Sequence, residues 1–263
     1  MRISGSTVLL TGATGGIGRA IAKALADRGA NLIVTGRRGD LLEDLVARYG
    51  GRSLAVDLAV ADDVDRLVQE AGDVDILVAN AALPASGALE SFTPSEIDRA
   101  LDVNLRAPMV LSRQLAPRMA ARGRGHLLFV SSILGKMPQA YGSVYSATKF
   151  GLRGFGGSLR ADLRGTGVGV SVVFPGIIRE AGMFADANVK PPKGLRTNSP
   201  DDVARGVAVA IEKNSGEVVV APLPMRLMAG LGAVAPGVIT ALAQRMGAND
   251  MVVELAAGQR PKR

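Results

Sequence analysis

Short apolar runs that alternate with amphipathic stretches constrain the fold of this chain more than any other feature of its sequence. The first run, Thr7 to Leu10, leads through a glycine-rich turn into a helical stretch that ends at Gly29. Similar apolar runs follow at 31–38, 51–59, 73–83, 123–132, 167–176 and 216–222. Helices are predicted between them, among others at 62–70, 94–122 and 201–213. The 94–122 stretch is interpreted as one long helix or as two helices joined at Pro108.

Strands that alternate with helices predict an α/β fold: a doubly wound, Rossmann-like parallel sheet of about seven strands with helices on both faces. We find no internal repeat, low-complexity tract or linker, so residues 1–263 are predicted to form a single dinucleotide-binding and catalytic domain. Within it, the polar, Pro/Gly-rich stretch 177–200 is predicted to be a substrate loop with little helix. Residues 223–247 are predicted to form an apolar C-terminal helical segment.

The composition argues against several classes of function. The chain has no cysteine and a single histidine, His126, so disulfides and metal sites are not expected. His126 opens a strand-like run and is predicted to be structural. Aromatic residues make up 3% of the chain, which argues against a stacking platform for nucleic acid. The net charge of +7 is scattered and indicates a basic soluble surface, and no signal peptide is evident, so a cytoplasmic protein is expected.

The glycine-rich turn after the first strand predicts a phosphate-binding site. Gly12, Gly16 and Gly18 allow a tight turn and a close approach of the backbone to a diphosphate. The N-terminus of the helix that follows adds N–H groups and a partial positive charge. The next strand ends in Arg37 and Arg38, with no acidic residue at its end. Because arginine accommodates a ribose 2′-phosphate there, whereas an acid would hold the 2′-OH, NADP(H) is favoured over NAD(H).

Ser132, Tyr145 and Lys149 form the candidate catalytic group. Tyr145 and Lys149 lie four residues apart on a predicted helix and therefore share one face. A cation about 5 Å from the phenol is expected to lower the pKa of Tyr145 by roughly 2 units. That shift would suit general acid–base catalysis near neutral pH. Ser132 follows the fifth apolar run, at the carboxyl edge of the sheet where ligands of such folds bind.

These motifs together resemble the short-chain dehydrogenase/reductase superfamily, over nearly all of the chain up to about Val220. The family's TGxxxGxG pattern matches residues 11–18, and its YxxxK pattern matches Tyr145 to Lys149. Its asparagine-rich strand end, its active-site asparagine, its serine and its Pro-Gly pair match Asn80-Ala81, Asn104, Ser132 and Pro175-Gly176.

The resemblance implies a role for each matching residue. Tyr145 would be the general acid or base, Ser132 would hydrogen-bond the substrate oxygen, and Lys149 would bind the nicotinamide ribose and lower the pKa of the tyrosine. Asn104 would hold a water molecule that links Lys149 to solvent. The cofactor contacts implied are Gly12, Thr14, Gly16, Ile17, Gly18, Arg37, Arg38, Asp57, Leu58, Asn80, Ala81, Tyr145, Lys149, Pro175, Gly176 and Ile178.

The chain departs from the family pattern at two places. Ala79 and Ala82 replace the first Asn and the Gly of the strand-end motif Asn-Asn-Ala-Gly. Glu180 stands where many members carry a threonine. A carboxylate near a diphosphate is unfavourable, so either Glu180 points away or the neighbouring Arg179 compensates its charge.

The function expected from the sequence is an NADP(H)-dependent oxidoreductase for small carbonyl or alcohol substrates, which acts as a homodimer or homotetramer. A second hypothesis is a cofactor-binding regulatory protein on the same fold. The run from Leu227 to Gln244 has no charge and is split at Pro236-Gly237, which favours a pair of short helices over a membrane span. This segment is predicted to be a lid for lipophilic substrates. A third hypothesis is a reductase attached to a membrane surface through this segment and the tail residues Arg260, Lys262 and Arg263.

Overall fold

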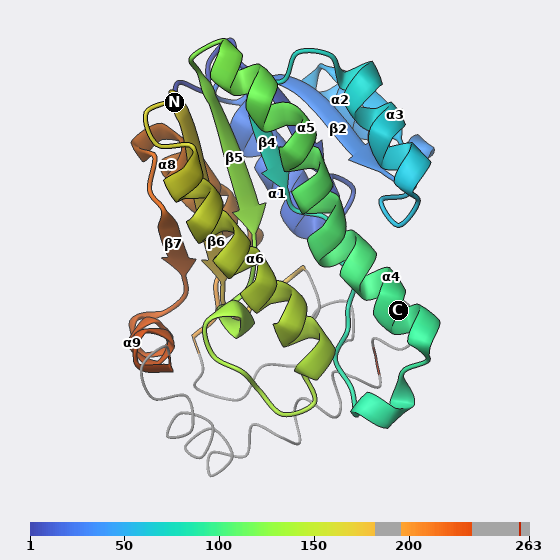
Figure 1. Cartoon of the computed structure of the whole chain (residues 1–263), viewed down its shortest axis with the longest axis vertical. Helices are drawn as coiled ribbons and strands as arrows, with labels where there is room; N and C mark the ends of the chain where they lie inside the picture. Colours follow the sequence, from blue (N-terminus) through green and yellow to red (C-terminus); the bar gives the residue numbers. More distant parts are fainter. Residues whose placement is uncertain (182–195, 233–257, 259–263) are drawn as a thin grey trace.

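One parallel sheet organises the computed structural model, which describes residues 1–181, 196–232 and 258 (Figure 1). Its seven strands lie in the order β3-β2-β1-β4-β5-β6-β7. The direction in which strands are added reverses between β1 and β4, which creates the crevice where ligands bind in such sheets. The predicted doubly wound α/β fold is confirmed. The strands are β1 (Thr7–Thr11), β2 (Asn31–Gly36), β3 (Arg52–Ala55), β4 (Ile76–Ala79), β5 (Gly125–Val130), β6 (Val168–Pro175) and β7 (Glu217–Val220).

Helices cover both faces of the sheet, with α5 and α6 in front of it and α1 and α8 behind it in Figure 1. The alternation of side chains along each strand supplies both cores. In β1, Val8 and Leu10 pack with α1, α2 and α8, whereas Leu9 packs with α3, α5 and α6. The helices are α1 (Gly16–Ala26), α2 (Gly39–Tyr49), α3 (Ala61–Ala71), α4 (Pro94–Leu101), α5 (Ala107–Ala121), α6 (Ser143–Asp162), α8 (Pro200–Lys213) and α9 (Leu223–Gly232).

The 94–122 stretch forms two helices, but they do not meet at Pro108 as the sequence suggested. A π-helical turn, Asp102–Arg106, joins α4 to α5. Pro108 lies in the first turn of α5, where its missing N–H costs no hydrogen bond. Thr93 begins α4 through a capping box with Glu96. The sequence left one helix or two open and offered Pro108 as the junction, whereas the junction lies a few residues earlier.

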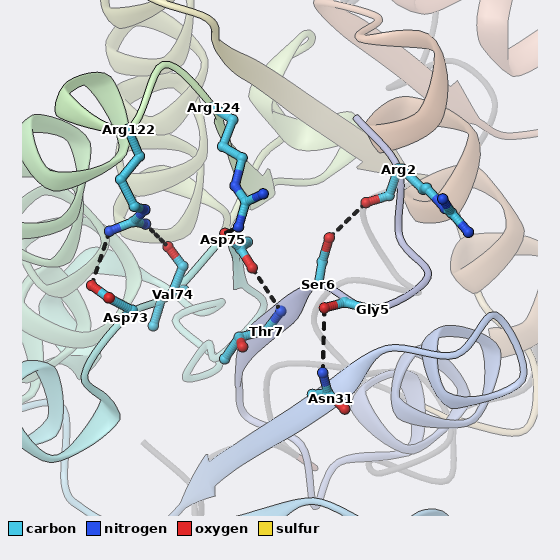
Figure 2. A network of polar contacts seen from close by, with 10 residues as sticks. All are labelled: Arg2, Gly5, Ser6, Thr7, Asn31, Asp73, Val74, Asp75, Arg122 and Arg124. Atoms are coloured by element: carbon cyan, nitrogen blue, oxygen red, sulfur yellow. Dashed lines mark hydrogen bonds and ion pairs between the residues drawn. The ribbon is translucent and has the colours of Figure 1, made fainter.

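The amino-terminal edge of the sheet is closed by polar contacts between neighbouring loops (Figure 2). The Asp75 carboxylate accepts a hydrogen bond from the Thr7 N–H at 3.0 Å and lies 3.4 Å from the guanidinium of Arg124. Arg122 binds Asp73 at 3.0 Å and donates to the Val74 carbonyl at 2.7 Å. These contacts fix the edge that faces away from the candidate site.

His126 is buried in β5, as expected for a structural residue. Its Nε2 lies 2.9 Å from the hydroxyl of Ser171 on β6. Burial lowers the pKa of His126 to about 3, so the ring is neutral at physiological pH. His126 has no part in the arrangement described below.

The predicted substrate loop and C-terminal segment are described only at their edges. Residues 182–195 lie outside the described residues, and a short parallel bridge between Ile178 and Asn198 brackets them. Helix α9, Leu223–Gly232, covers the start of the C-terminal segment. Pro236-Gly237, the second predicted helix and the basic tail lie outside the described residues. Among the helices that the structure describes, none is long and apolar enough to cross a membrane.

Candidate active site

The turn between β1 and α1 is built for close backbone contacts. Gly12 has a φ of +65°, and a Cβ atom there would lie 2.7 Å from the Cα of Ala81. A Cβ on Gly18 would lie 2.2 Å from the carbonyl oxygen of Gly12. Only glycine fits at both positions, because such separations are shorter than van der Waals contact allows.

The start of α1 offers a site for an anion. Helix α1 begins at Gly16, and its N-cap, Gly15, supplies no side-chain hydrogen bond. The first turn carries no acidic residue and includes Ile17 and Gly18. The N–H groups of this turn therefore keep their positive partial charge for a ligand. The bare glycine turn and uncapped N-terminus together fit the diphosphate of a dinucleotide.

The ends of β1 and β4 are locked together beside this turn. The Thr11 hydroxyl accepts hydrogen bonds from the N–H groups of Asn80 and Ala81, both at 3.0 Å. The Asn80 side chain donates to the carbonyls of Thr11 and Gly12, both at 3.1 Å. The side chain of Asn80 thus braces the glycine turn. A ligand contact at this strand end would fall to the backbone of 80–81.

Arg37 and Arg38 follow β2 directly, as the sequence predicted. Arg38 donates to the hydroxyl of Thr14 at 3.1 Å, so its guanidinium turns toward the glycine-rich turn. Arg37 lies close enough to Asp57 to lower the pKa of that carboxyl. Both arginines therefore border the site at the end of β2, with Arg37 on the side of β3.

Asp57 stands just beyond β3 and is held from two sides. One carboxylate oxygen accepts from the Ala59 N–H at 3.0 Å, and the other accepts from Arg99 of α4 at 2.8 Å. Burial raises the pKa of Asp57, but the Ala59 hydrogen bond and Arg99 outweigh it, so the pKa lies below its usual value. Leu58, the next residue, is buried in the core.

Ser132, Tyr145 and Lys149 meet at the carboxyl edge of the sheet. Ser132 follows β5, and its hydroxyl accepts from the Leu134 N–H at 3.2 Å and hydrogen-bonds Tyr145. Lys149 is buried, donates to the carbonyl of Val130 at 3.1 Å, and places its Nζ 5.5 Å from the centre of the Tyr145 ring. The three side chains are thus arranged as a hydroxyl, a phenol and a cation at one place.

The pKa values at this centre differ from the expectation. Burial raises the pKa of Tyr145 above its usual value of 10, and the hydrogen bond with Ser132 offsets this only in part. Burial lowers the pKa of Lys149 to about 8. The predicted lowering of the tyrosine pKa by Lys149 is therefore wrong for this structure. The helical spacing indicated that the two groups lie close together, but not that both are buried away from solvent.

Asn104 lies in the π-helical turn between α4 and α5 and is fully buried. Its side-chain carbonyl accepts from the Leu83 N–H at 2.6 Å, and its amide donates to the Leu83 carbonyl at 3.0 Å. The side chain thus ties the π turn to the loop after β4 through one accepted and one donated hydrogen bond. A side-chain amide can form more hydrogen bonds than these two, so the expected water-holding role stays a prediction. π turns are frequent at functional sites, and this one fixes the loop that borders the candidate site.

Pro175 and Gly176 end β6 beside the β7 end. The Gly176 N–H donates to the Val220 carbonyl at 2.9 Å, and a Cβ on Gly176 would lie 2.9 Å from the Sδ of Met225 in α9. The next residues include the buried Ile178, which forms the bridge to Asn198. Helix α9 thus lies next to the Pro-Gly turn.

The structure answers the question left open about Glu180. Its side chain is exposed and pairs with Arg179, whose Nε lies 3.1 Å from a Glu180 oxygen. Arg179 also donates to the Thr197 carbonyl at 2.8 Å. Ala181 follows, and its Cβ lies where a side chain on Gly16 would stand, at 2.4 Å from that position. The loop after β6 thus reaches the start of α1, and the charge of Glu180 is compensated by its neighbour.

Two positions that the sequence did not single out stand beside these residues. Arg99 binds Asp57 across 42 positions of sequence. Lys136, after β5, is buried, binds Glu217 of β7 and lies 4.5 Å above the ring of Phe174. A linear pattern cannot reveal such pairs, because each partner is an ordinary charged residue until the fold brings it to the other.

The comparisons with known proteins agree with this geometry. The short chain dehydrogenase family matches residues 6–191 of the chain. Ketoacyl reductase HetN of Nostoc sp. is 35% identical over 262 residues, which cover 94% of this chain and 91% of that protein.

Solved structures give the same result. A short-chain dehydrogenase from Sphingobium yanoikuyae in complex with NADPH is 28% identical, with a TM-score of 0.77, over 87% of this chain and 93% of that one. A 3-ketoacyl-(acyl-carrier-protein) reductase from Brucella melitensis complexed with NADH is 26% identical, with a TM-score of 0.75, over 83% of this chain and 97% of that one. The chain belongs to the short-chain dehydrogenase/reductase family and is an NAD(P)-dependent oxidoreductase.

Proposed function

We propose that this protein is an NADP(H)-dependent oxidoreductase that interconverts a carbonyl and an alcohol, with Tyr145 as its general acid and base. The observation that carries the proposal is the meeting of Ser132, Tyr145 and Lys149 at the same edge of the sheet as the uncapped, glycine-rich start of α1. When bound, the nicotinamide supplies or accepts the hydride.

The chain's own residues transfer the proton and bind the reacting oxygen of the substrate. In reduction, the Tyr145 phenol gives its proton to the carbonyl oxygen, and in oxidation its phenolate takes the proton of the alcohol. The raised pKa of Tyr145 keeps the phenol protonated, which suits the acid role in reduction. Ser132 hydrogen-bonds the same oxygen. Lys149 holds the nicotinamide ribose and stabilises the phenolate that forms when the proton leaves.

The preference for NADP(H) is proposed to rest on Arg37, with Arg38 as a second contact. Both follow β2, where a dinucleotide places its adenosine ribose. No acidic residue follows this strand to hold a 2′-OH, since Asp40 lies in the first turn of α2. A guanidinium binds a 2′-phosphate with charge-assisted hydrogen bonds.

We further propose that the substrate is lipophilic. Helix α9 lies against the Pro-Gly turn through Met225, and its exposed side carries Leu223, Leu227 and Leu231, with exposed fractions of 66, 61 and 60%. These leucines recur every fourth residue and so share one face. An apolar helix beside the site suits an acyl or polycyclic group. The names of the Nostoc and Brucella relatives make a 3-ketoacyl thioester the first compound to test.

The decisive experiment measures oxidation of NADPH by the purified protein with 3-ketoacyl thioesters, ketones and aldehydes of increasing chain length. We expect turnover that Tyr145→Phe abolishes while NADPH still binds, because the ring remains and the exchangeable proton is lost. A Phe variant that keeps more than about a tenth of the wild-type kcat would overturn the acid–base role. NADPH binding without turnover of any compound would favour the cofactor-binding regulator instead.

The exposed leucine face of α9 also favours a second reading, a reductase that binds membrane surfaces. The helix contains Arg226 and no acidic residue, so an anionic lipid surface would suit it. Sedimentation with anionic but not neutral vesicles at physiological salt, lost in Leu227→Gln, is the result expected of this reading. Unchanged kinetics for long-chain substrates in the same variant would then count against a lid.

Self-association is proposed to use the outer sides of α5 and α6. Met109 of α5 and Phe150 of α6 are exposed apolar residues on these long helices. A homodimer or homotetramer would bury them. Analytical ultracentrifugation of the wild type and of Phe150→Glu tests this, and an unchanged mass for the variant would exclude this surface.

A further inference from the structure

Arg99 neutralises a carboxylate beside the arginines to which we assign the 2′-phosphate. It lies in the last turn of α4, and its guanidinium is 2.8 Å from an Asp57 oxygen. Asp57 is only partly exposed, and its other oxygen accepts the Ala59 N–H. The carboxylate is thus fixed in one position, and Arg99 is the charged group that binds it directly.

Asp57 and Arg37 are neighbours across two strand ends. Gly36 of β2 pairs with Ala55 of β3, and the Val56 N–H donates to the Gly36 carbonyl at 3.0 Å. Arg37 follows Gly36 directly, and Asp57 follows Val56. Electrostatic contact between them helps to lower the pKa of Asp57. A charge on Asp57 therefore acts on whatever Arg37 binds.

A free Asp57 carboxylate would oppose a 2′-phosphate in two ways. It would repel the phosphate, and it would draw the guanidinium of Arg37 toward itself. A ribose 2′-OH is neutral and is held by carboxylates in related sites, so NAD(H) would suffer neither effect. The acidic residues around Arg99 add to the negative field, since Glu96, Asp98 and Asp102 line the same surface hollow.

We propose that Arg99 is a specificity-determining residue that makes the adenosine end of the site select NADP(H), by occupying Asp57 and leaving Arg37 free for the 2′-phosphate. This rests on the proposed function above. Arg99 acts through Asp57 and is a positioning residue with respect to the cofactor. This contribution to cofactor preference comes from α4, a helix outside the nucleotide-binding strands and turns.

The test compares the dissociation constants of NADPH and NADH, measured by calorimetry, in the wild type and in Arg99→Met. We expect the ratio of the two constants to shift toward NADH by about tenfold, because Asp57 is only partly exposed and its charge is therefore only partly screened. Arg99→Lys should keep most of the preference. Arg122→Met is the matched control: it loses an ion pair at the opposite edge of the sheet (Figure 2) and should leave the ratio unchanged.

A double variant separates the electrostatic effect from a change of shape. In Arg99→Met combined with Asp57→Asn, there is no carboxylate left to neutralise, so the ratio should return to within about twofold of the Asp57→Asn value. A ratio unchanged in Arg99→Met, or not restored in the double variant, would overturn the role of Arg99 alone. A wild type that prefers NADH, or binds neither nucleotide, would overturn the proposed function and this inference with it.

Discussion

Replacing Lys149 by methionine should stabilise the protein in the absence of nucleotide while it weakens nucleotide binding. The ammonium group is buried, and the Val130 carbonyl at 3.1 Å is its only hydrogen-bond partner among the described residues. Burial lowers its pKa from 10.5 to about 8, which corresponds to roughly 3 kcal/mol of destabilisation of the charged form. Methionine has a similar length and no charge. Because it also gives up the bond to Val130, we expect a net gain of about 1–3 kcal/mol near pH 7.

The pH dependence follows from the direction of the shift. The folded-state pKa of Lys149 lies below the unfolded value, so the folded state binds its proton less tightly. The destabilisation is complete below pH 8 and is relieved as the pH rises from about 8 toward 10.5. The difference in unfolding free energy between Lys149→Met and the wild type should therefore narrow over that window.

Urea denaturation at pH 7 and pH 10 without nucleotide measures the expected gain in stability and its pH dependence. Lys136→Met is the matched control, since Lys136 is a second buried lysine whose charge is paired with Glu217. Its loss should destabilise the protein, because it removes a charge that has a partner. The reasoning is refuted if Lys149→Met is less stable than the wild type at pH 7, or if its advantage is the same at both pH values.

Three further predictions concern the nucleotide and the turnover. Arg37→Ala should raise the Kd for NADPH by about 10- to 100-fold and change that for NADH little, and an equal loss for both would contradict its assignment to the 2′-phosphate. Gly18→Ala should lower the Tm and abolish NADPH binding, because its Cβ would collide with the Gly12 carbonyl, whereas Gly39→Ala, which meets open space, should do neither. The kcat/KM for carbonyl reduction should fall above pH about 8, as Lys149 loses its proton; a profile flat to pH 9 would exclude that ionisation from catalysis.

The sequence predicted the sheet because its strands obey simple rules. The central parallel strands are buried on both faces, so they stand out as continuous apolar runs, and the crossover helices have a clear period. β6, from Val168 to Pro175, is buried throughout, and the predicted run 167–176 is one residue longer at each end. The break between α4 and α5 was placed at Pro108, because proline is the only signal in the sequence. The true junction is a π turn over Asp102–Arg106, and such a turn has no residue signature of its own.

The candidate site was predictable where a residue acts through its backbone or its spacing. Gly12 and Gly18 can be recognised in the sequence because no other residue fits at their positions. Tyr145 and Lys149 can be recognised because residues four apart on a helix lie on one face. Partnerships across the fold were not predictable. Arg99 reaches Asp57 only because α4 packs beside the β3 end.

The sequence failed on the pKa values for a physical reason that concerns the whole centre. Spacing predicts that Tyr145 and Lys149 are close, and at a fixed dielectric closeness alone would lower the pKa of the phenol. Burial opposes this attraction, because it disfavours the charged form of each group, the phenolate and the ammonium, and so favours the neutral forms. A buried lysine can also be paired with an opposite charge, since Lys136 is buried and forms an ion pair with Glu217. The chain supplies no carboxylate to Lys149 among the described residues, so its charge remains available for a ligand, and the stability lost by burying it is the expected consequence of keeping a cation ready at a binding site.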